Sequence, residues 1–145
     1  MPTRSARTTW TGGLQDGSGR VELASSGAGA YDVSFPKRAA DNAGGTTSPE
    51  ELVAAAHSSC FSMALSNEIA EAGGKPRSLD VTADVTLGPD PAGGFRLTGI
   101  KLTVRGTVTG LDSDGFAKAA ATAKAGCPIS KALTGVEITL DAALA

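Results

Sequence analysis

The segment Ser48–Leu65, "SPEELVAAAHSSCFSMAL", decides the fold of this 145-residue chain. Ser48 can cap a helix, Pro49 fits the first helical position, and Glu51 completes a capping box. The adjacent glutamates also lie at the positive end of the helix dipole. The helix should run from Pro49 to about Ala72, where two glycines stop it. Because its middle is apolar on almost every side, we expect a buried central helix.

Three short alternating segments before this helix predict β-strands. They are "TTWTGGL" (8–14), "RVELA" (20–24) and "AYDVSF" (30–35). Turn-rich sequence separates them, so we expect a small antiparallel meander, with Pro36 ending its third strand. A loop that carries Lys37 and Arg38 should then lead to the helix.

The chain after the helix predicts a long hairpin, a second helix and a last strand. The hairpin strands are 78–87 and 95–108, and a change of phase at Thr98-Gly99 indicates a β-bulge. Asp112 or Ser113 can cap the second helix, and "VEITLDAAL" (136–144) alternates as a strand. The apolar stripe of that helix comprises Phe116, Ala119, Ala120 and Ala123. This order of elements predicts an α+β fold in a single domain over residues 1–145.

The composition narrows the classes of partner. The net charge is −2 and no basic cluster is present, so we expect no nucleic-acid partner. No apolar stretch is long enough to cross a bilayer, and the first residues lack the apolar stretch of a secretory signal. We therefore expect a cytoplasmic protein with no membrane partner. Aromatic residues are only 4% of the chain, so its core is thin and subunit association would help to bury it.

The two cysteines are the candidates for chemistry, because cytoplasmic thiols are normally reduced. Cys60 in the middle of the helix can be a space-filling core residue or a nucleophile. Cys127 lies between Gly126 and Pro128, at the start of a further helical turn, where backbone N–H groups favour a thiolate. If the two thiols meet, they could cycle between dithiol and disulfide. The residue pattern alone leaves open whether they meet.

His57, the only histidine, precedes Cys60 by three positions on the same helical side. A metal site would use His57, Cys60 and Cys127. It would have three ligands at most and lacks the paired spacing of a zinc module, so we expect no metal. His57 could instead polarise the Cys60 thiol. We favour a buried histidine that is hydrogen-bonded to the backbone.

Helix geometry separates Glu50 from Cys60. They are ten positions apart, which corresponds to roughly 15 Å at ~1.5 Å per residue. The two side chains therefore cannot touch within one chain. Two such helices packed antiparallel in a dimer could bring Glu50 of one chain to Cys60 of the other.

With "SPEELVAAAHSSCFSMAL" and "AKAGCPISKAL" both in view, the chain resembles the OsmC/Ohr family of thiol peroxidases, and the OsmC branch in particular. The resemblance implies an OsmC-like fold in which two subunits intertwine, with active sites at their interface. It also implies reduction of organic hydroperoxides, and more weakly of hydrogen peroxide, without metal or other cofactor. Cys60 would be the peroxidatic thiolate and Cys127 the resolving thiol. An external dithiol, of lipoyl type in the family, would reduce their disulfide.

The same resemblance assigns charged residues. Glu50 matches the family's acidic residue after proline, and it would act with an arginine on the cysteine of the opposite subunit. We prefer Arg38 for this arginine and keep Arg20 as the alternative. A guanidinium near Cys60 would offset the effect of burial, which raises the pKa of a thiol.

Leu52, Val53, Phe61 and Met63 are candidate apolar walls for an alkyl hydroperoxide. Two other functions stay open. The thiol pair could serve a non-catalytic redox sensor or small-ligand-binding protein, or the cysteines could only pack in a structural dimer.

Overall fold

The computed structural model describes every residue from Met1 to Ala145. Its contacts fall into two compact units, residues 1–52 and residues 53–145. The boundary lies in the first turn and a half of helix α2 (Pro49–Glu71). A single domain over the whole chain stays a prediction. None of the helices combines the length and the apolar character that crossing a bilayer needs.

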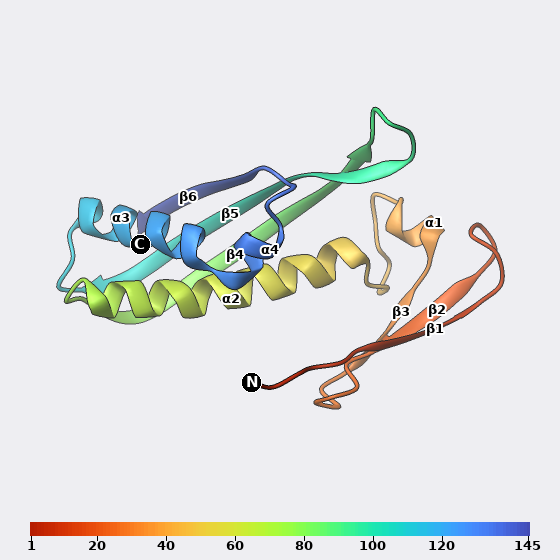
Figure 1. The fold of residues 1–145 in the computed structure, drawn as a ribbon, viewed down its shortest axis with the longest axis horizontal. Coiled ribbons are helices and arrows are strands. Elements are labelled where there is room, and N and C mark those ends of the chain that lie inside the picture. Colours follow the sequence, from red (N-terminus) through yellow and green to blue (C-terminus); the bar gives the residue numbers. More distant parts are fainter. The chain divides into compact units, whose positions relative to one another are not determined.

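The first unit contains the expected meander. Strands β1 (Arg7–Thr11), β2 (Ser18–Glu22) and β3 (Ala30–Val33) form an antiparallel sheet in that order (Figure 1). Most of its side chains are at least partly exposed. The sheet therefore holds little apolar core of its own.

The region around Pro36 differs from the prediction. Strand β3 ends at Val33, and Pro36 lies inside a short helix, α1 (Phe35–Arg38), rather than at a strand end. Ser34 caps this helix by accepting a hydrogen bond from the Lys37 N–H at 3.3 Å. Proline suits a first helical turn because its N–H would have no partner there. As a result Arg38 lies on a helix and not in a loop.

Helix α2 begins and ends where the sequence predicts, within one residue. The Glu51 N–H donates to Ser48 Oγ at 3.2 Å, while the Glu51 carboxylate accepts from Thr47 Oγ1 at 2.6 Å. The expectation of burial on every side is wrong for this chain alone. One stripe is buried, and Met63 on another side is 72% exposed. The buried stripe comprises His57, Phe61, Leu65 and Ile69.

The second unit contains a three-stranded sheet. Strands β4 (Lys75–Pro89) and β5 (Phe95–Thr109) pair antiparallel, and β6 (Ile138–Leu144) pairs parallel to β5. Thr86 pairs with Gly99 but Leu87 pairs with Leu97, so the predicted bulge at Thr98 is confirmed. The parallel pairing of β6 was outside the reach of the sequence pattern.

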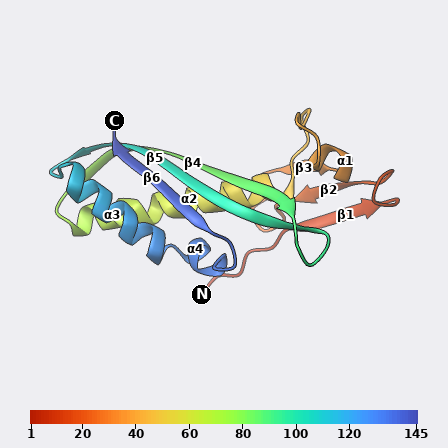
Figure 2. The same cartoon turned by 90° about the horizontal axis from the view of Figure 1, so that it is seen from above.

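Helix α2 from Val53 onward and helix α3 (Ser113–Gly126) pack on one face of this sheet (Figures 1 and 2). Asp112 caps α3 by accepting from the Gly115 N–H at 2.8 Å. The predicted stripe of α3 is buried in full. A side chain at Gly106 of β5 would lie 2.7 Å from the Phe116 ring, so glycine lets that ring lie against the strand. Small residues thus give this core its close packing.

Candidate active site

The two thiols come from different helices of the second unit. Cys60 lies in the middle of α2 and is partly exposed, whereas Cys127 is fully buried between α3 and α4 (Pro128–Ala132). The Cys127 N–H donates to the Ala123 carbonyl at 2.8 Å, and its carbonyl accepts from the Lys131 N–H at 3.0 Å. Cys127 therefore ends one helix and starts the next, which fixes its backbone. Both thiols are free and each acts on the ionisation of the other.

The environment of Cys60 opposes its ionisation. Burial raises the pKa of the Cys60 thiol, and the neighbouring Cys127 raises it further. The Ile129 N–H, which lowers it, only partly compensates. Cys60 therefore lacks a positive charge that would make it a thiolate near neutral pH.

Cys127 has the opposite tendency. Burial disfavours its thiolate, but the neighbouring polar hydrogens of the Ser130 N–H, Cys60, the Ser130 hydroxyl and the Ile129 N–H outweigh burial and lower the pKa of Cys127. In this coupled pair the negative charge is thus better accommodated on Cys127. The sequence predicts that backbone N–H groups favour a thiolate at Cys127, and the lowered pKa of Cys127 has the same direction.

His57 is fully buried beside this pair, with Nε2 2.8 Å from Ser130 Oγ. The prediction of a backbone partner is wrong, because the partner is a side chain of α4. Burial lowers the pKa of His57, so its ring is neutral, and Nδ1 has no hydrogen-bond partner. No group of three or more His, Cys, Asp or Glu side chains is arranged so that it could hold a metal ion, and the absence of a metal centre stays a prediction.

The charged pair of the candidate site lies in the first unit. Arg38 Nη2 donates to Glu50 Oε1 at 2.6 Å, and Arg38 Nε lies 3.1 Å from both carboxylate oxygens. Burial opposes ionisation of Glu50, but Arg38 and local hydrogen bonds prevail and its pKa is lowered. Arg20 instead pairs with Asp32 at 2.8 Å in an exposed position. The structure therefore brings Glu50 together with Arg38 and not with Arg20.

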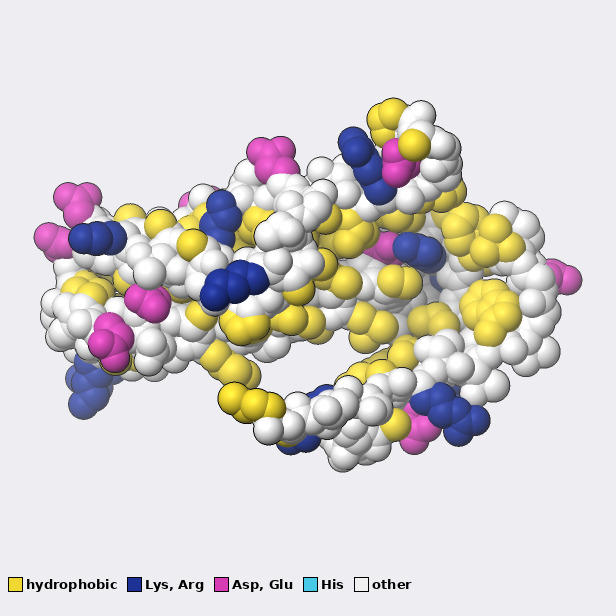
Figure 3. Space-filling view, in the orientation of Figure 1, with side chains coloured by type: hydrophobic (Ala, Val, Ile, Leu, Met, Phe, Trp, Pro, Cys, Tyr) yellow, Lys and Arg dark blue, Asp and Glu magenta, His cyan; other side chains and the backbone are white.

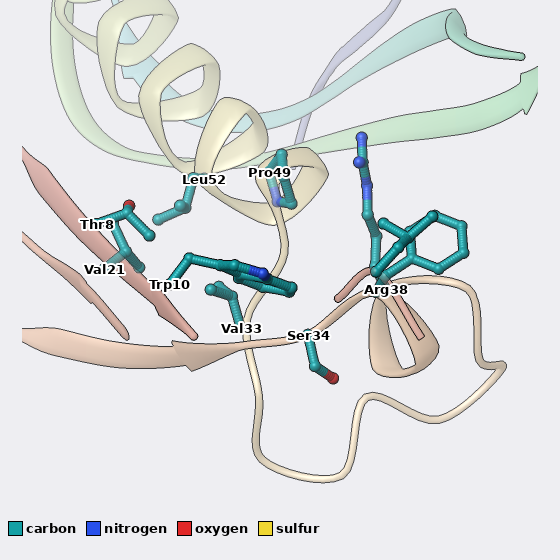
Figure 4. A pocket seen from close by; sticks show the side chains of 10 residues that line it. Thr8, Trp10, Val21, Val33, Ser34, Arg38, Pro49 and Leu52 are labelled. Atoms are coloured by element: carbon teal, nitrogen blue, oxygen red, sulfur yellow. The ribbon is translucent and has the colours of Figure 1, made fainter. Parts of the chain in front are cut away.

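An apolar cavity of about 320 Å³ lies beside Arg38 within the first unit. In Figure 4, Leu52 and Pro49 at the start of α2 lie near Trp10, with Arg38 extended alongside. Hydrophobic side chains gather on the face of this unit that Figure 3 shows. The cavity is lined by Thr8, Trp10, Leu14, Val21, Val33, Ser34, Phe35, Arg38, Pro49 and Leu52.

Three of the four predicted walls do not line this cavity. Leu52 does, but Val53 does not, Phe61 is fully buried in the core and Met63 is exposed. The sequence-based reasoning missed Trp10, which is 43% exposed despite its size. The sequence signal that could have indicated Trp10 as a cavity residue was an aromatic side chain in a short, half-apolar strand.

Together these features are typical of a thiol-based redox protein. Two free thiols interact at the junction of two helices in the second unit, and an arginine–glutamate pair lies in the first unit. Such a thiol pair is suited to reversible oxidation and needs no bound group for it.

Comparison with known proteins then gives the family. The profile described as OsmC-like protein matches residues 41–141, so the chain belongs to the OsmC-like protein family. It is 42% identical to Peroxiredoxin OsmC of Escherichia coli (strain K12) over 138 residues, which cover 95% of this chain and 94% of that protein. The predicted resemblance is confirmed.

Solved structures agree with this membership. An organic hydroperoxide resistance protein from Elizabethkingia anophelis has a TM-score of 0.80 and 31% identity, with 100% of this chain and 98% of that one covered. OhrB of Bacillus subtilis, also an organic hydroperoxide resistance protein, has a TM-score of 0.75 and 29% identity, with 97% and 98% covered. The α+β, OsmC-like fold is thus confirmed. The chain is a thiol-dependent peroxidase rather than a structural protein or a non-catalytic sensor.

Proposed function

We propose that this enzyme reduces organic hydroperoxides to alcohols, and hydrogen peroxide more weakly, with Cys60 as the peroxidatic and Cys127 as the resolving thiol. The interacting pair of free thiols carries the proposal. Cys60 is the partly exposed member, so a peroxide in solution can reach it, whereas Cys127 is fully buried. The names of the relatives, a peroxiredoxin and organic hydroperoxide resistance proteins, support the same chemistry.

The reaction has one oxidative step, one condensation step and one reductive step. The Cys60 thiolate attacks the distal peroxide oxygen, the O–O bond breaks, and the leaving alkoxide takes a proton to become the alcohol. The Cys127 thiolate then attacks the Cys60 sulfenic sulfur. A disulfide forms, and the leaving hydroxide takes a proton to become water. A dithiol reductant of lipoyl type restores both thiols by exchange.

Cys60 needs a cation, and we assign this role to Arg38, oriented by Glu50. Glu50 and Cys60 are ten positions apart on α2, roughly 15 Å at ~1.5 Å per residue. We therefore propose an intertwined homodimer in which Arg38 and Glu50 of one chain act on Cys60 of the other. The apolar flank of α2 that this chain leaves exposed, including Met63, supports such an association.

The cavity beside Arg38 suits an alkyl or aryl group, because its lining is mostly apolar. A guanidinium at its edge would face the charge that develops on the peroxide oxygen. This arrangement favours an organic hydroperoxide over hydrogen peroxide. We also place the enzyme in the cytoplasm, where dithiol reductants keep thiols reduced.

The first test compares the wild type with Cys60→Ser, Cys127→Ser and the matched control Ser62→Ala, with cumene hydroperoxide and dithiothreitol. We expect no turnover in Cys60→Ser and normal turnover in the control. In Cys127→Ser, before dithiothreitol is added, one equivalent should be reduced without the intramolecular disulfide. Full activity in Cys60→Ser would refute the mechanism.

A second test mixes two inactive variants, Cys60→Ser and Arg38→Met, after dissociation and reassociation. If the site is shared, half of the sites in each mixed dimer are intact, so about a quarter of wild-type activity should return. If each chain holds a complete site, mixing restores nothing, and the shared site is wrong.

A further inference from the structure

The mechanism above leaves one buried polar pair unused. His57 of α2 and Ser130 of α4 are 0% and 7% exposed, and His57 Nε2 lies 2.8 Å from Ser130 Oγ. Removing two polar side chains from water is unfavourable unless their hydrogen bonds are made. The pair joins the helix of Cys60 to the helix that Cys127 caps, so it lies next to the reacting sulfurs in the fold.

The unpartnered Nδ1 identifies the tautomer of His57. The ring is neutral because burial lowers the pKa of His57, so it carries one N–H. A buried N–H without an acceptor is rarer in proteins than an acceptor without a donor. Since Nδ1 has no partner, the hydrogen belongs on Nε2, which then donates to Ser130 Oγ.

This tautomer decides which way the Ser130 hydroxyl points. A hydroxyl has one hydrogen to donate, and here its oxygen already accepts from His57. The hydrogen is therefore available to the Cys127 sulfur, because Ser130 follows Cys127 by three positions in the first turn of α4 and its hydroxyl contributes to the lowered pKa of Cys127. The opposite tautomer would use that same hydrogen on His57 and leave none for the sulfur.

We propose that His57 is a positioning residue that holds the Ser130 hydroxyl as a hydrogen-bond donor to the Cys127 sulfur, and so prepares Cys127 for attack on the Cys60 sulfenic acid. This inference rests on the proposed function. In this proposal Ser130 donates to the reacting sulfur, while His57 acts through Ser130. In resolution the Cys127–Cys60 bond forms, the Cys60 S–O bond breaks, and hydroxide leaves with a proton as water.

The same donor serves the reductive step. When a dithiol attacks the Cys60 sulfur of the disulfide, Cys127 leaves as a thiolate, and a lower thiol pKa makes a better leaving group. The titratable groups that face Cys127 are Cys60 and, through Ser130, His57, both from α2. No charged side chain is among the causes of its lowered pKa, so the uncharged donors determine it.

The test measures the pKa of Cys127 by thiolate absorbance in a Cys60→Ser background. We expect Ser130→Ala to raise this pKa by about one, because a hydrogen bond to a charged group is lost. His57→Met should raise it in the same direction. Ser130→Thr keeps the hydroxyl and His57→Gln keeps an N–H near the position of Nε2, so both should retain the low value.

A single-turnover experiment in the otherwise wild-type protein supplies the kinetic readout. We expect Ser130→Ala and His57→Met to form the Cys60 sulfenic acid at the normal rate but to close the disulfide up to about tenfold more slowly at neutral pH. Ser62→Ala, which removes a hydroxyl from another face of α2, is the control. A normal pKa and a normal rate of disulfide closure in folded Ser130→Ala would overturn the inference.

If Ser130→Ala or His57→Met fails to fold, Ser130→Thr and His57→Gln still test the inference, because each is expected to keep the low pKa of Cys127. If either loses the low pKa while folded, the donor geometry is wrong. Failure of the proposed function gives a different result, since the wild type would then form neither sulfenic acid nor disulfide with cumene hydroperoxide.

Discussion

The two units of this chain provide different environments for reactive groups. In residues 1–52, Val21 is the one buried apolar side chain, and the charged pair keeps some solvent contact, with Arg38 31% and Glu50 11% exposed. In residues 53–145, the thiols adjoin a core of fully buried apolar side chains. A unit with few buried apolar side chains lets charged groups keep contact with water and stay ionised. A densely packed core holds two thiols next to each other. Each unit supplies what the other cannot.

The largest expected difference between the units concerns stability. Phe116→Ala removes a fully buried ring that packs against Gly106, so it should lower the free energy of unfolding by about 3–5 kcal/mol. Val21→Ala removes less from the first unit and should cost about 1–2 kcal/mol. Chemical denaturation of both variants measures the two costs. Equal losses would show that the first unit has as dense a core as the second.

The next effect separates the two arginines of the first unit. Arg38→Met should lower kcat/KM for cumene hydroperoxide by about 10²–10³, as expected when a group that stabilises developing charge is lost. Arg20→Met is the matched control, because Arg20 pairs with Asp32 on an exposed strand surface and should change kcat/KM little. Initial rates at several peroxide concentrations give both values. A comparable loss in Arg20→Met would reverse the assignment.

Local sequence signals predicted most of the fold. The cap at Ser48, the bulge at Thr98 and the stripe around Phe116 each depend on residues close in sequence, and the structure confirms all three. Pro36 was misread because proline both ends strands and starts helices. The choice depended on the Ser34 cap.

Features that depend on distant residues were harder to predict. The sequence led us to overestimate the burial of α2 within its own chain. The sequence pattern of an apolar helix is the same whether its own chain or another chain covers it. The contact between His57 and Ser130 joins residues 73 positions apart, and no periodicity reports such a pair. Likewise, the family resemblance assigned Glu50 and Arg38 to the same site, but only the three-dimensional structure shows the ion pair between them.

The smallest expected effect concerns the pH dependence of the Arg38–Glu50 pair. The folded-state pKa of Glu50 is lowered, so the pair stabilises the fold above the unfolded-state pKa, and this contribution is lost as the pH falls through the folded-state value. Glu50→Gln should therefore cost about 1–2 kcal/mol at pH 7 and much less near pH 3. Arg38 stays protonated throughout, because the hydrogen bonds that it donates to the same carboxylate raise its pKa.

Denaturation of the wild type and Glu50→Gln at both pH values gives this difference. Asp32→Asn is the matched control, because its ion pair with Arg20 is exposed and such pairs contribute about 0–1 kcal/mol. If Glu50→Gln costs no more than Asp32→Asn at pH 7, the partial burial of the Arg38–Glu50 pair adds nothing to stability. Catalysis alone would then explain why the Arg38–Glu50 pair lies beside the cavity. The loss of activity in Arg38→Met would be the only effect that distinguishes this pair from an ordinary surface ion pair.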